Sequence, residues 1–438
     1  MNYDSAVNST SIKTTQAAAY AYALRLEKTV SVEFESDLIG KMFLDCFVDA
    51  VARTVTFLPD DTAFVRTGDI SAMWLRDSSA QMRLYVDVSA HVPEFQELVR
   101  RVIARQIAFI NIDPYANAFN EEPNGAGHDD LTERSSWVWE RKFELDSLCY
   151  PIQLSYLLWK RSGRVDHFTS DWRAAVKTIL SVVRTEQDHE KLSTYRFERP
   201  GGPVSDSLIR NGQGCEVAPT GMVWSGFRPS DDACGLGFLV PANMFAAVSL
   251  GQLSEIAHDV LGDYELTVQA RQVEKVIREG IDTFAVHDHP DFGPIFAYEV
   301  DGYGRANFMD DANVPNLLSL PYIGYCDIDD VLYRNTRAFI MSESNPYFYS
   351  GTYAQGLGSP HTPDGWVWHL GMAMAGLTSS DHVFKRDTVL AMCNTTAMSL
   401  QMHESFDPDN PTRFTRQWFS WANAMFCELI LDVIGVRP

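Results

Sequence analysis

The sequence predicts an all-α fold in which paired helices form a ring, with a site at one loop-rich end. Segments with apolar residues at three- and four-residue spacing dominate the 438 residues, and strand-like segments are few. No proline- or serine-rich linker and no low-complexity segment divides the chain. The 45% hydrophobic content is enough for one large core, although length alone also allows two or three domains. We therefore expect residues 1–438 to form a single domain.

The helical pattern recurs along the whole chain and is clear in the segment FQELVRRVIARQIAFI. There Phe95, Leu98, Val99, Val102 and Ile103 begin one broad apolar stripe. By this spacing, helices are expected over residues 14–28, 36–57, 70–87, 93–112, 137–162, 169–186, 240–261, 264–284, 310–320, 327–340, 362–377, 382–401 and 418–435. Strand-like patterns are limited to residues 53–59, 193–199 and 294–300.

Composition and charge exclude several classes of partner. With 36 basic against 58 acidic residues, the net charge is −22, which disfavours binding to nucleic acid. No stretch reaches the roughly 18 apolar residues of a membrane span, and the polar first residues show no secretory signal. The seven cysteines are irregularly spaced without a CxxC, which favours free thiols in a reducing compartment. The sequence thus predicts a soluble cytoplasmic protein with no nucleic-acid or membrane partner.

Six loop segments share one composition, because each combines Trp, Tyr or Phe with carboxylates, Arg or His. They span residues 66–81, 125–147, 224–238, 307–325, 349–373 and 403–426. Aromatic rings can cover the C–H faces of a pyranose while polar side chains bond its hydroxyls, so these segments indicate a sugar site. The alternative for any single segment is that its aromatic residues pack in the core and that Asp69, Asp130 and Asp232 cap helices.

Other chemistries find little support in the sequence. No HExxH or close histidine pair occurs, and neither DIDD at 327–330 nor FMDDAN matches a calcium loop. The Walker, GxGxxG and GxSxG patterns are also absent. We therefore expect no metal, no cofactor and no serine or cysteine nucleophile. A pair of carboxylates acting across a glycosidic bond then remains as the simplest chemistry.

The adjacent aspartates of FRPSDDAC, Asp231 and Asp232, offer the protonated carboxyl group that such a reaction needs. A nearby like charge raises the pKa of a carboxyl group. Arg228 is close enough in sequence to keep one member of the pair ionised. A second carboxylate must activate water, and Glu404 in HESF follows a predicted helix and precedes an Arg- and Trp-rich segment.

The chain resembles glycoside hydrolase family 125 in motifs that run from about residue 66 to 426. These motifs are WLRDSSAQ, GHDDLTERSSWVWERKFELDSLCYPIQL, FRPSDDAC, FMDDANVPNLLSLPYIGY, GSPHTPDGWVWHLGMA and HESF…FTRQWFSWAN. That family contains exo-acting α-1,6-mannosidases, so the resemblance implies this activity. It also implies an (α/α)6 barrel, no metal, and hydrolysis with inversion at the anomeric carbon. It also implies a general acid in the SDD motif and a general base near the C-terminus. The acid then falls on Asp231 or Asp232, and the base on Glu404.

We prefer Asp231 as the acid, by analogy with the distantly related glucoamylases, in which the first member of an adjacent acidic pair is the acid. Asp232 would then bind a hydroxyl or cap the following helix. The substrate implied by the resemblance is a mannose-containing oligosaccharide, whose terminal α-mannose enters a pocket at the loop-rich end. Candidate contacts to it are Trp74, Arg76, Asp77, His128, Asp129, Asp232, His361 and Arg416. The long loops at 113–136 and 341–365 could close one end of the groove, as exo action requires.

Rival functions remain open at this point. A different helical-barrel glycosidase, or a phosphorylase that uses phosphate in place of water, would have a similar pattern. Beyond Arg413 and Arg416, however, no basic pocket for phosphate is evident. A catalytically silent glycan-binding protein would keep the aromatic and arginine positions, but both acidic positions are present. The mannose linkage rests on the resemblance, and the sequence does not predict the oligomeric state.

Overall fold

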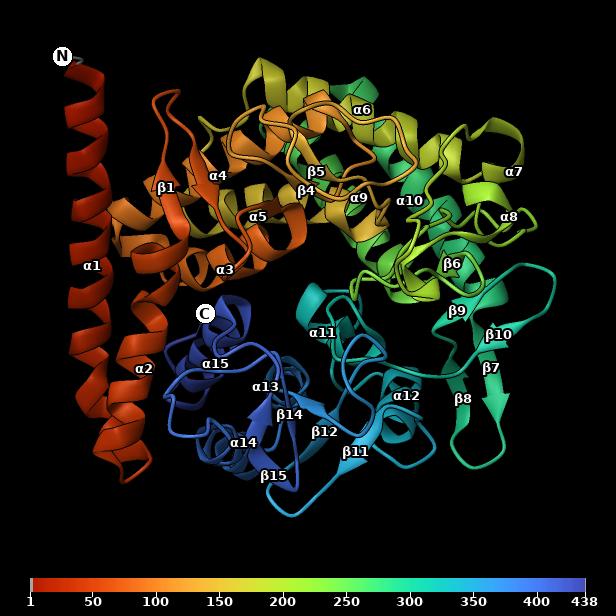
Figure 1. Cartoon of the computed structure of the whole chain (residues 1–438). Helices are drawn as coiled ribbons and strands as arrows, with labels where there is room; N and C mark the ends of the chain where they lie inside the picture. Colours follow the sequence, from red (N-terminus) through yellow and green to blue (C-terminus); the bar gives the residue numbers. More distant parts are fainter. Residues whose placement is uncertain (1–2, 438) are drawn as a thin grey trace.

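The chain of this computed structural model winds once around a ring in which outer and inner helices alternate (Figure 1). The structure describes residues 3–437. The outer helices are α2 (Asp37–Asp49), α4 (Pro93–Ile112), α6 (Ser170–Glu186), α10 (Tyr264–Phe284), α12 (Val331–Ile340) and α14 (His382–Asn394). The inner elements are α3 (Leu75–Asp87), α5 (Leu145–Ser162), α9 (Val240–Asp259), η4 (Leu317–Ser319) with α11 (Leu320–Ile323), α13 (His369–Leu377) and α15 (Ser420–Val433).

Contacts between neighbouring inner helices close this ring. α3 packs against α5, α5 against α9, α9 against α11, η4 against α13, and α13 against α15. The last inner helix, α15, then packs against both α3 and α2 at the beginning of the ring. The (α/α)6 barrel expected from the sequence is confirmed.

The inner and outer positions follow from the distribution of apolar residues. All residues of α13 are buried, so this helix has no face for solvent and lies inside the ring. α10 instead buries one stripe that includes Leu266, Ala270, Val273 and Ile277, and its opposite face is exposed. Its first turn is fixed by Asp263, whose side chain accepts a hydrogen bond from the Leu266 N–H at 3.0 Å.

The fifth inner element is shorter than the apolar pattern predicts. The helix expected over 310–320 is wrong, because residues 310–316 are irregular and only the 3₁₀ turn η4 and one helical turn follow. Asp310 explains the difference, since its carboxylate accepts the N–H groups of Leu317 and Leu318 at 2.9 Å each and so fixes the helix start there. Asn316 and Ser319 add a capping box at the same place.

Other predicted segments change where loop residues keep the backbone extended. The helices expected over 137–162 and 362–377 shorten to α5 and α13, which follow the extended residues Glu144 and Trp368. The helix expected over 382–401 ends at Asn394, and the strand expected over 193–199 does not form. The other two strand predictions are confirmed in part, by β1 (Val55–Phe57) and by β8 (Gly293–Phe296) with β9 (Glu299–Val300).

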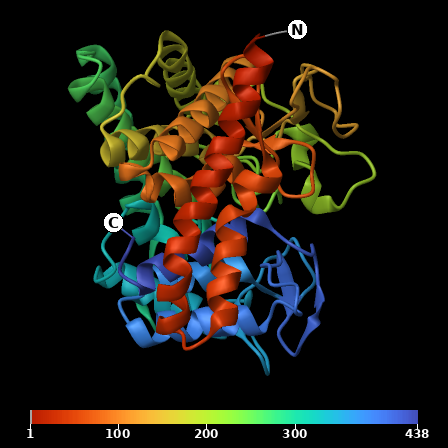
Figure 2. The same cartoon turned by 90° about the vertical axis from the view of Figure 1, so that its left-hand side faces the viewer.

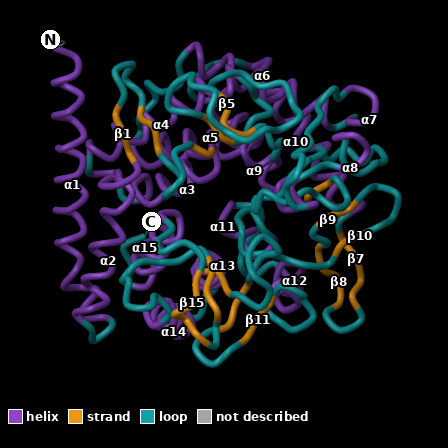
Figure 3. The backbone as a smooth tube through the Cα atoms, viewed as in Figure 1, coloured by secondary structure: helices purple, strands orange, loops and turns teal. Residues whose placement is uncertain are grey.

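Short antiparallel strands stand directly before three inner helices and lie scattered among the loops (Figure 3). β3 (Met73–Trp74) leads into α3, β6 (Phe238–Leu239) into α9, and β13 (Val367–Trp368) into α13. β4 (Ala118–Phe119) and β5 (Val138–Glu140) extend the first sheet, β9 and β10 (Ala306–Asn307) the second, and β14 (Ser405–Asp407) and β15 (Asn410–Phe414) the third. The N-terminal ends of the inner helices are thereby linked to the loops of mixed aromatic and polar composition.

The remaining elements lie at the periphery. Three hairpins pair β1 with β2 (Ala63–Val65), β7 (Val286–His289) with β8, and β11 (Phe348–Ser350) with β12 (Gln355–Leu357). Short helical turns are η1 (Ala50–Thr54), η2 (Ser89–His91), α7 (His189–Leu192), η3 (Val204–Asp206) and α8 (Ile209–Gly212). The long helix α1 (Tyr3–Glu33) runs beside α2 outside the ring (Figures 1 and 2) and buries Ala19, Ala23 and Val30 there.

Two further predictions concern the whole chain. All seven cysteines are free thiols, and Cys46, Cys149, Cys234 and Cys427 are buried. Among the residues that the structure describes, none of the helices combines the length and apolarity that crossing a membrane requires.

Candidate active site

A pocket of about 50 Å³ lies at the N-terminal ends of the inner helices. It is lined by Thr67, Ile70, Trp74, Arg76, Asp77, Pro229, Ser230, Asp231, Asn313, His361, Trp368, Glu404, Arg416, Phe419 and Trp421. Arg76 and Asp77 belong to the first turn of α3, and Trp368 and Phe419 stand directly before α13 and α15. Most of the residues predicted from the sequence are thus brought together by the convergence of several helix starts.

Asp231 and Glu404 reach this pocket from segments far apart in the sequence. The Asp231 side chain is 26% exposed and that of Glu404 is 11% exposed, so both carboxylates are accessible from the pocket. Asp231 follows the turn Pro229–Ser230 and has a left-handed backbone with φ 67°. Glu404 directly precedes β14, which pairs with β13 so that Ser405 lies opposite Trp368. The structure therefore supplies two carboxyl groups, from distant segments, to one cavity.

Basic neighbours keep Asp231 ionised. Arg76 Nη2 and Asn117 Nδ2 each lie 3.5 Å from Asp231 Oδ1, and Lys142 Nζ donates to the Asp231 carbonyl oxygen at 2.7 Å. Burial tends to raise the pKa of Asp231, but the charges of Lys142 and Arg76 outweigh it and lower the pKa to about 2. The expectation that the adjacent Asp232 would hold Asp231 protonated is therefore not met.

Asp232 takes different partners from Asp231. Its Oδ2 accepts a hydrogen bond from Ser230 Oγ at 2.8 Å, and its Oδ1 lies 3.9 Å from His361 Nδ1. It is only 5% exposed and is not among the residues that line the pocket, so it borders the site through His361. The expectation that Arg228 keeps one of the two aspartates ionised is wrong, because Arg228 Nε donates to Glu299 Oε1 at 2.7 Å.

His361 provides positive charge among the carboxylates. Burial tends to lower the pKa of His361, but Asp232, Asp231 and Glu404 outweigh it and raise the pKa to about 9. More than a third of the side chain, 38%, is exposed, so solvent screens part of this attraction. The imidazolium ring can donate hydrogen bonds to a ligand in the pocket.

Arg76 lies at the centre of a buried group of charges. Its Nη1 donates to Glu144 Oε2 at 2.7 Å and to Asp146 Oδ2 at 3.2 Å, and its Nε lies 3.8 Å from Asp77 Oδ2. Burial raises the pKa of Glu144 well above its usual value, and the charge of Asp231 adds to this rise against the effect of Arg76. Burial also raises the pKa of Asp77 to about 6 although Arg76 opposes it. The carboxyl groups of Glu144 and Asp77 therefore hold their protons to higher pH than exposed carboxyl groups do.

Two further residues predicted from the sequence, Arg416 and Trp74, also line the pocket. Arg416 Nε lies 3.5 Å from Glu404 Oε1 and 3.7 Å from Asp69 Oδ1, so it holds positive charge beside the Glu404 carboxylate. Trp74 Nε1 is buried and has no hydrogen-bond partner among the described residues, which leaves a donor for a bound hydroxyl group. Both positions fit the sugar-binding composition that the sequence indicates.

The structure does not bring His128 and Asp129 to the pocket lining. Both lie in an exposed loop, where the His128 ring meets the Trp139 ring edge-on and its carbonyl oxygen accepts from Arg134 Nη2 at 2.9 Å. The neighbouring Asp130 anchors this loop by accepting two hydrogen bonds from Arg199, at 2.6 and 2.9 Å. Substrate contact by His128 and Asp129 stays a prediction.

Several residues of the site were not singled out from the sequence. Thr67, Ile70, Asn313, Trp368, Phe419 and Trp421 line the pocket. Lys142, Glu144 and Asp146 surround Asp231 and Arg76 although they come from a segment read as helix. The available signal was the high density of charged residues in WERKFELDS, which is unusual directly before a mainly apolar stretch.

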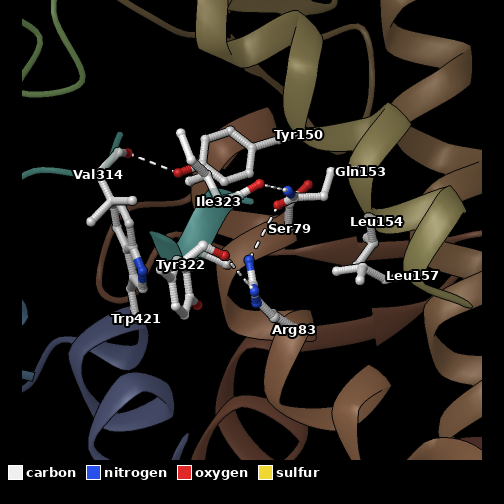
Figure 4. A pocket seen from close by; sticks show the side chains of 11 residues that line it. Ser79, Arg83, Tyr150, Gln153, Leu154, Leu157, Val314, Tyr322, Ile323 and Trp421 are labelled. Atoms are coloured by element: carbon white, nitrogen blue, oxygen red, sulfur yellow. Dashed lines mark hydrogen bonds between the residues drawn. The ribbon is translucent and has the colours of Figure 1, made fainter. Parts of the chain in front are cut away.

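A second, smaller cavity of about 10 Å³ shares Trp421 with the pocket (Figure 4). Tyr150 donates to the Val314 carbonyl at 2.8 Å, Gln153 Nε2 to the Ile323 carbonyl at 3.2 Å, and Arg83 Nη2 to the Tyr322 carbonyl at 2.9 Å. Such a volume is about that of a single water molecule. Among the described residues, no group of three or more His, Cys, Asp or Glu side chains is arranged to hold a metal ion.

Comparison with known proteins gives consistent results. A family model described as metal-independent α-mannosidase (GH125) matches residues 36–431. The meiotically up-regulated gene 157 protein of Schizosaccharomyces pombe is 35% identical over 432 residues, which cover 93% of this chain and 85% of that protein. A solved structure from Streptococcus pneumoniae, a metal-independent α-mannosidase in a non-productive complex with α-1,6-mannobiose, is 43% identical. It covers 95% of this chain and 99% of its own, with a TM-score of 0.92. A glycosidase bound to glucose, 12% identical with a TM-score of 0.52 over 92% of this chain and 98% of its own, shares the fold alone.

Proposed function

Because this chain belongs to the metal-independent α-mannosidases of glycoside hydrolase family 125, we propose that it releases single mannose units from α-1,6-linked mannosides with inversion at the anomeric carbon. The observation that carries this proposal is that Asp231 and Glu404 line one pocket together with aromatic and basic side chains. The α-1,6-mannobiose bound by the Streptococcus pneumoniae relative supports the linkage.

Each carboxyl group has a separate part in the reaction. Asp231 delivers a proton to the O6 atom of the departing sugar as the C1–O6 bond breaks. Glu404 removes a proton from a water molecule, whose oxygen bonds to C1 from the opposite face. Arg416 Nε, 3.5 Å from Glu404 Oε1, places a positive charge beside the carboxylate that accepts the proton. This division requires the two carboxyl groups to stand roughly 6.5–9.5 Å apart, with water between them.

The remaining pocket residues bind the terminal mannose. Trp74, Asp77 and His361 offer hydrogen bonds to its hydroxyl groups, while Trp368 and Trp421 offer ring faces to its C–H groups. A small pocket lined on many sides admits a chain end and not the middle of a chain, so release is exo. The seven free thiols fit a reducing compartment, and we place the enzyme in the cytoplasm.

Incubation with linkage-defined mannobioses, followed by NMR, tests the proposal. The α-1,6-linked disaccharide should be hydrolysed fastest, and β-mannose should appear first, because water attacks opposite the leaving group. Asp231→Asn and Glu404→Gln should each lower kcat on mannobiose by about 10²–10⁴-fold, since each removes one proton transfer.

The contrary results are equally clear. Initial α-mannose would show retention, and stimulation of sugar release by phosphate would show a phosphorylase. Near-normal activity of either variant would remove that residue from the mechanism. Internal fragments from a longer α-1,6-mannan, in place of free mannose, would contradict exo action.

A further inference from the structure

The carboxyl group of Glu144 has an oxygen atom without a partner in the protein interior. Glu144 is 1% exposed, and its Oε2 accepts from Arg76 Nη1 at 2.7 Å and from Ser147 Oγ at 2.8 Å. Its Oε1 is buried and has no donor among the described residues. A buried carboxylate oxygen without a donor is unfavourable, whereas a protonated oxygen is itself a donor that needs an acceptor.

The carboxyl group best placed to accept this proton is that of Asp231. Both carboxyl groups contact the same guanidinium group, because Arg76 Nη1 donates to Glu144 Oε2 at 2.7 Å and Arg76 Nη2 lies 3.5 Å from Asp231 Oδ1. Two carboxyl groups on one guanidinium group cannot both ionise easily, and one proton shared between them would supply the missing partner of Glu144 Oε1. The charged and titratable groups that face this pair are Arg76 and Asp77 of α3, Lys142 before α5, Asp146 of α5, and His361.

The positive charges of Lys142 and Arg76 determine whether Glu144 or Asp231 carries this proton. They hold Asp231 as the anion in the free enzyme, while Glu144, beside Asp146 and away from solvent, keeps the proton. A general acid that is anionic at rest needs a source of protons next to it. Glu144 is the side chain in that position.

We propose that Glu144 stores the proton that Asp231 gives to the leaving sugar, and thus acts as a positioning residue for the general acid. This inference rests on the proposed role of Asp231. In the transition state the single shared proton passes from Glu144 to the Asp231 carboxylate and from Asp231 on to O6, which keeps the electrons of the broken C1–O6 bond. Glu144 and Asp231 are then both anions beside Arg76, and Glu404 holds the proton taken from water. Exchange of one proton with solvent, gained by Glu144 and lost by Glu404, restores the starting state.

Glu144→Gln tests this role, because glutamine keeps the size and a donor toward Asp231 but has no proton to transfer. Two substrates separate proton supply from structure: α-1,6-mannobiose needs protonation of its leaving group, whereas 2,4-dinitrophenyl α-mannoside does not. We expect kcat of Glu144→Gln to fall about 10²-fold on mannobiose and to change by less than about threefold on the aryl mannoside. The decline of kcat on mannobiose at high pH should also move to lower pH, because Asp231 alone loses its proton more readily.

Asp146→Asn is the matched control, because Asp146 contacts the same nitrogen of Arg76 at 3.2 Å and is equally buried. It should change kcat on both substrates by the same factor. Equal losses on both substrates for Glu144→Gln, no loss on mannobiose, or a mannobiose-selective loss in Asp146→Asn would each overturn the proposal. Asp231→Asn distinguishes failure of the proposed function from failure of the Glu144 role. If Asp231→Asn keeps its activity on mannobiose, the proposed function fails. If Asp231→Asn loses this activity and Glu144→Gln keeps it, only the Glu144 role fails.

Discussion

At the residue scale, Asp311 shows how a buried carboxyl group makes stability depend on pH. Asp311 is fully buried behind the pocket residue Asn313, whose N–H donates to its Oδ1 at 2.7 Å. Burial raises its pKa to about 6, although the Asn313 hydrogen bond and Arg228 oppose this. An unfolded aspartate titrates near about 3.9. The folded protein therefore binds this proton more tightly, and its stability declines as pH rises from about 4 to about 6.

Asp311→Asn should remove this share of the pH dependence. The amide keeps the acceptor for the Asn313 N–H but does not ionise. The free energy of unfolding of the variant, relative to wild type, should increase between pH 4 and pH 7 by up to about 3 kcal/mol, measured by urea denaturation.

Asp409→Asn is the control of opposite sign. Asp409 is exposed and accepts from Thr352 N at 2.7 Å and Oγ1 at 2.8 Å, which lowers its pKa. The stabilisation that the Asp409 carboxylate gives the folded state is present above the pKa of the unfolded state and is lost as pH falls. Asp409→Asn should therefore be less stable than wild type at pH 7. If the free energies of unfolding of Asp311→Asn and wild type differ by the same amount at pH 4 and pH 7, the expected role of Asp311 in the pH dependence is contradicted.

The site was predictable in part at this scale. Composition and the family resemblance predicted Asp231, Glu404, Arg76 and His361 as site residues, and the structure brings these four side chains to one pocket. The partners of Asp231 could not be predicted, since Lys142 and Glu144 reach it only through tertiary packing. The prediction that Asp232 would keep Asp231 protonated was wrong for the same reason, because the two neighbouring side chains contact different partners.

At the element scale, the contacts of α15 tie the end of the chain to its beginning. Glu428 of α15 is fully buried, and Arg437 Nη2 lies 3.2 Å from its Oε2. Arg437 Nε donates to Asp87 Oδ2 at the end of α3, at 3.2 Å. One guanidinium group therefore neutralises carboxylates of the first and last inner helices.

Arg437→Met should destabilise the protein by about 3–5 kcal/mol, because it leaves two buried carboxylates without their main cation. The midpoint of urea unfolding measures this loss. The double variant Arg437→Met with Glu428→Gln should recover part of it, since the amide does not need a counter-charge. A loss below about 1 kcal/mol, or no recovery in the double variant, would show that Arg83, 4.0 Å from Glu428, is sufficient alone.

Elements with a long periodic pattern were predicted well, and elements with polar interruptions were not. Residues 93–112 and 264–284 form α4 and α10 as expected, because an apolar stripe with a clear start fixes a helix by itself. The segment 310–320 has apolar residues at helical spacing, yet Asp310 uses its carboxylate to cap a later turn. Local periodicity does not show which backbone N–H groups a buried aspartate will bind.

At the scale of the whole molecule, the net charge of −22 limits the substrates that approach the pocket. A neutral oligosaccharide is indifferent to this field, whereas a phosphorylated one is repelled. Salt screens such repulsion over about 10 Å at 0.1 M ionic strength.

Kinetics at two salt concentrations test this effect. The KM for α-1,6-mannobiose should change by less than about twofold between 20 and 500 mM NaCl. The KM for a mannobiose with a phosphate group on the second sugar should be higher at low salt and fall as salt is added. A salt-dependent KM for the neutral disaccharide would contradict a purely electrostatic origin.

The left-handed backbone of Asp231 limits which substitutions remove its acid group without also straining the turn. Only glycine, asparagine and aspartate adopt that conformation readily, and most other side chains introduce strain there. Asparagine is therefore the substitute that removes the acid, keeps a side chain of the same size and leaves the turn relaxed, whereas alanine or glutamate would also strain the loop between Ser230 and Asp232. Any chain that uses this turn to present an acid is restricted, by conformation as much as by reactivity, to the shorter of the two acidic amino acids.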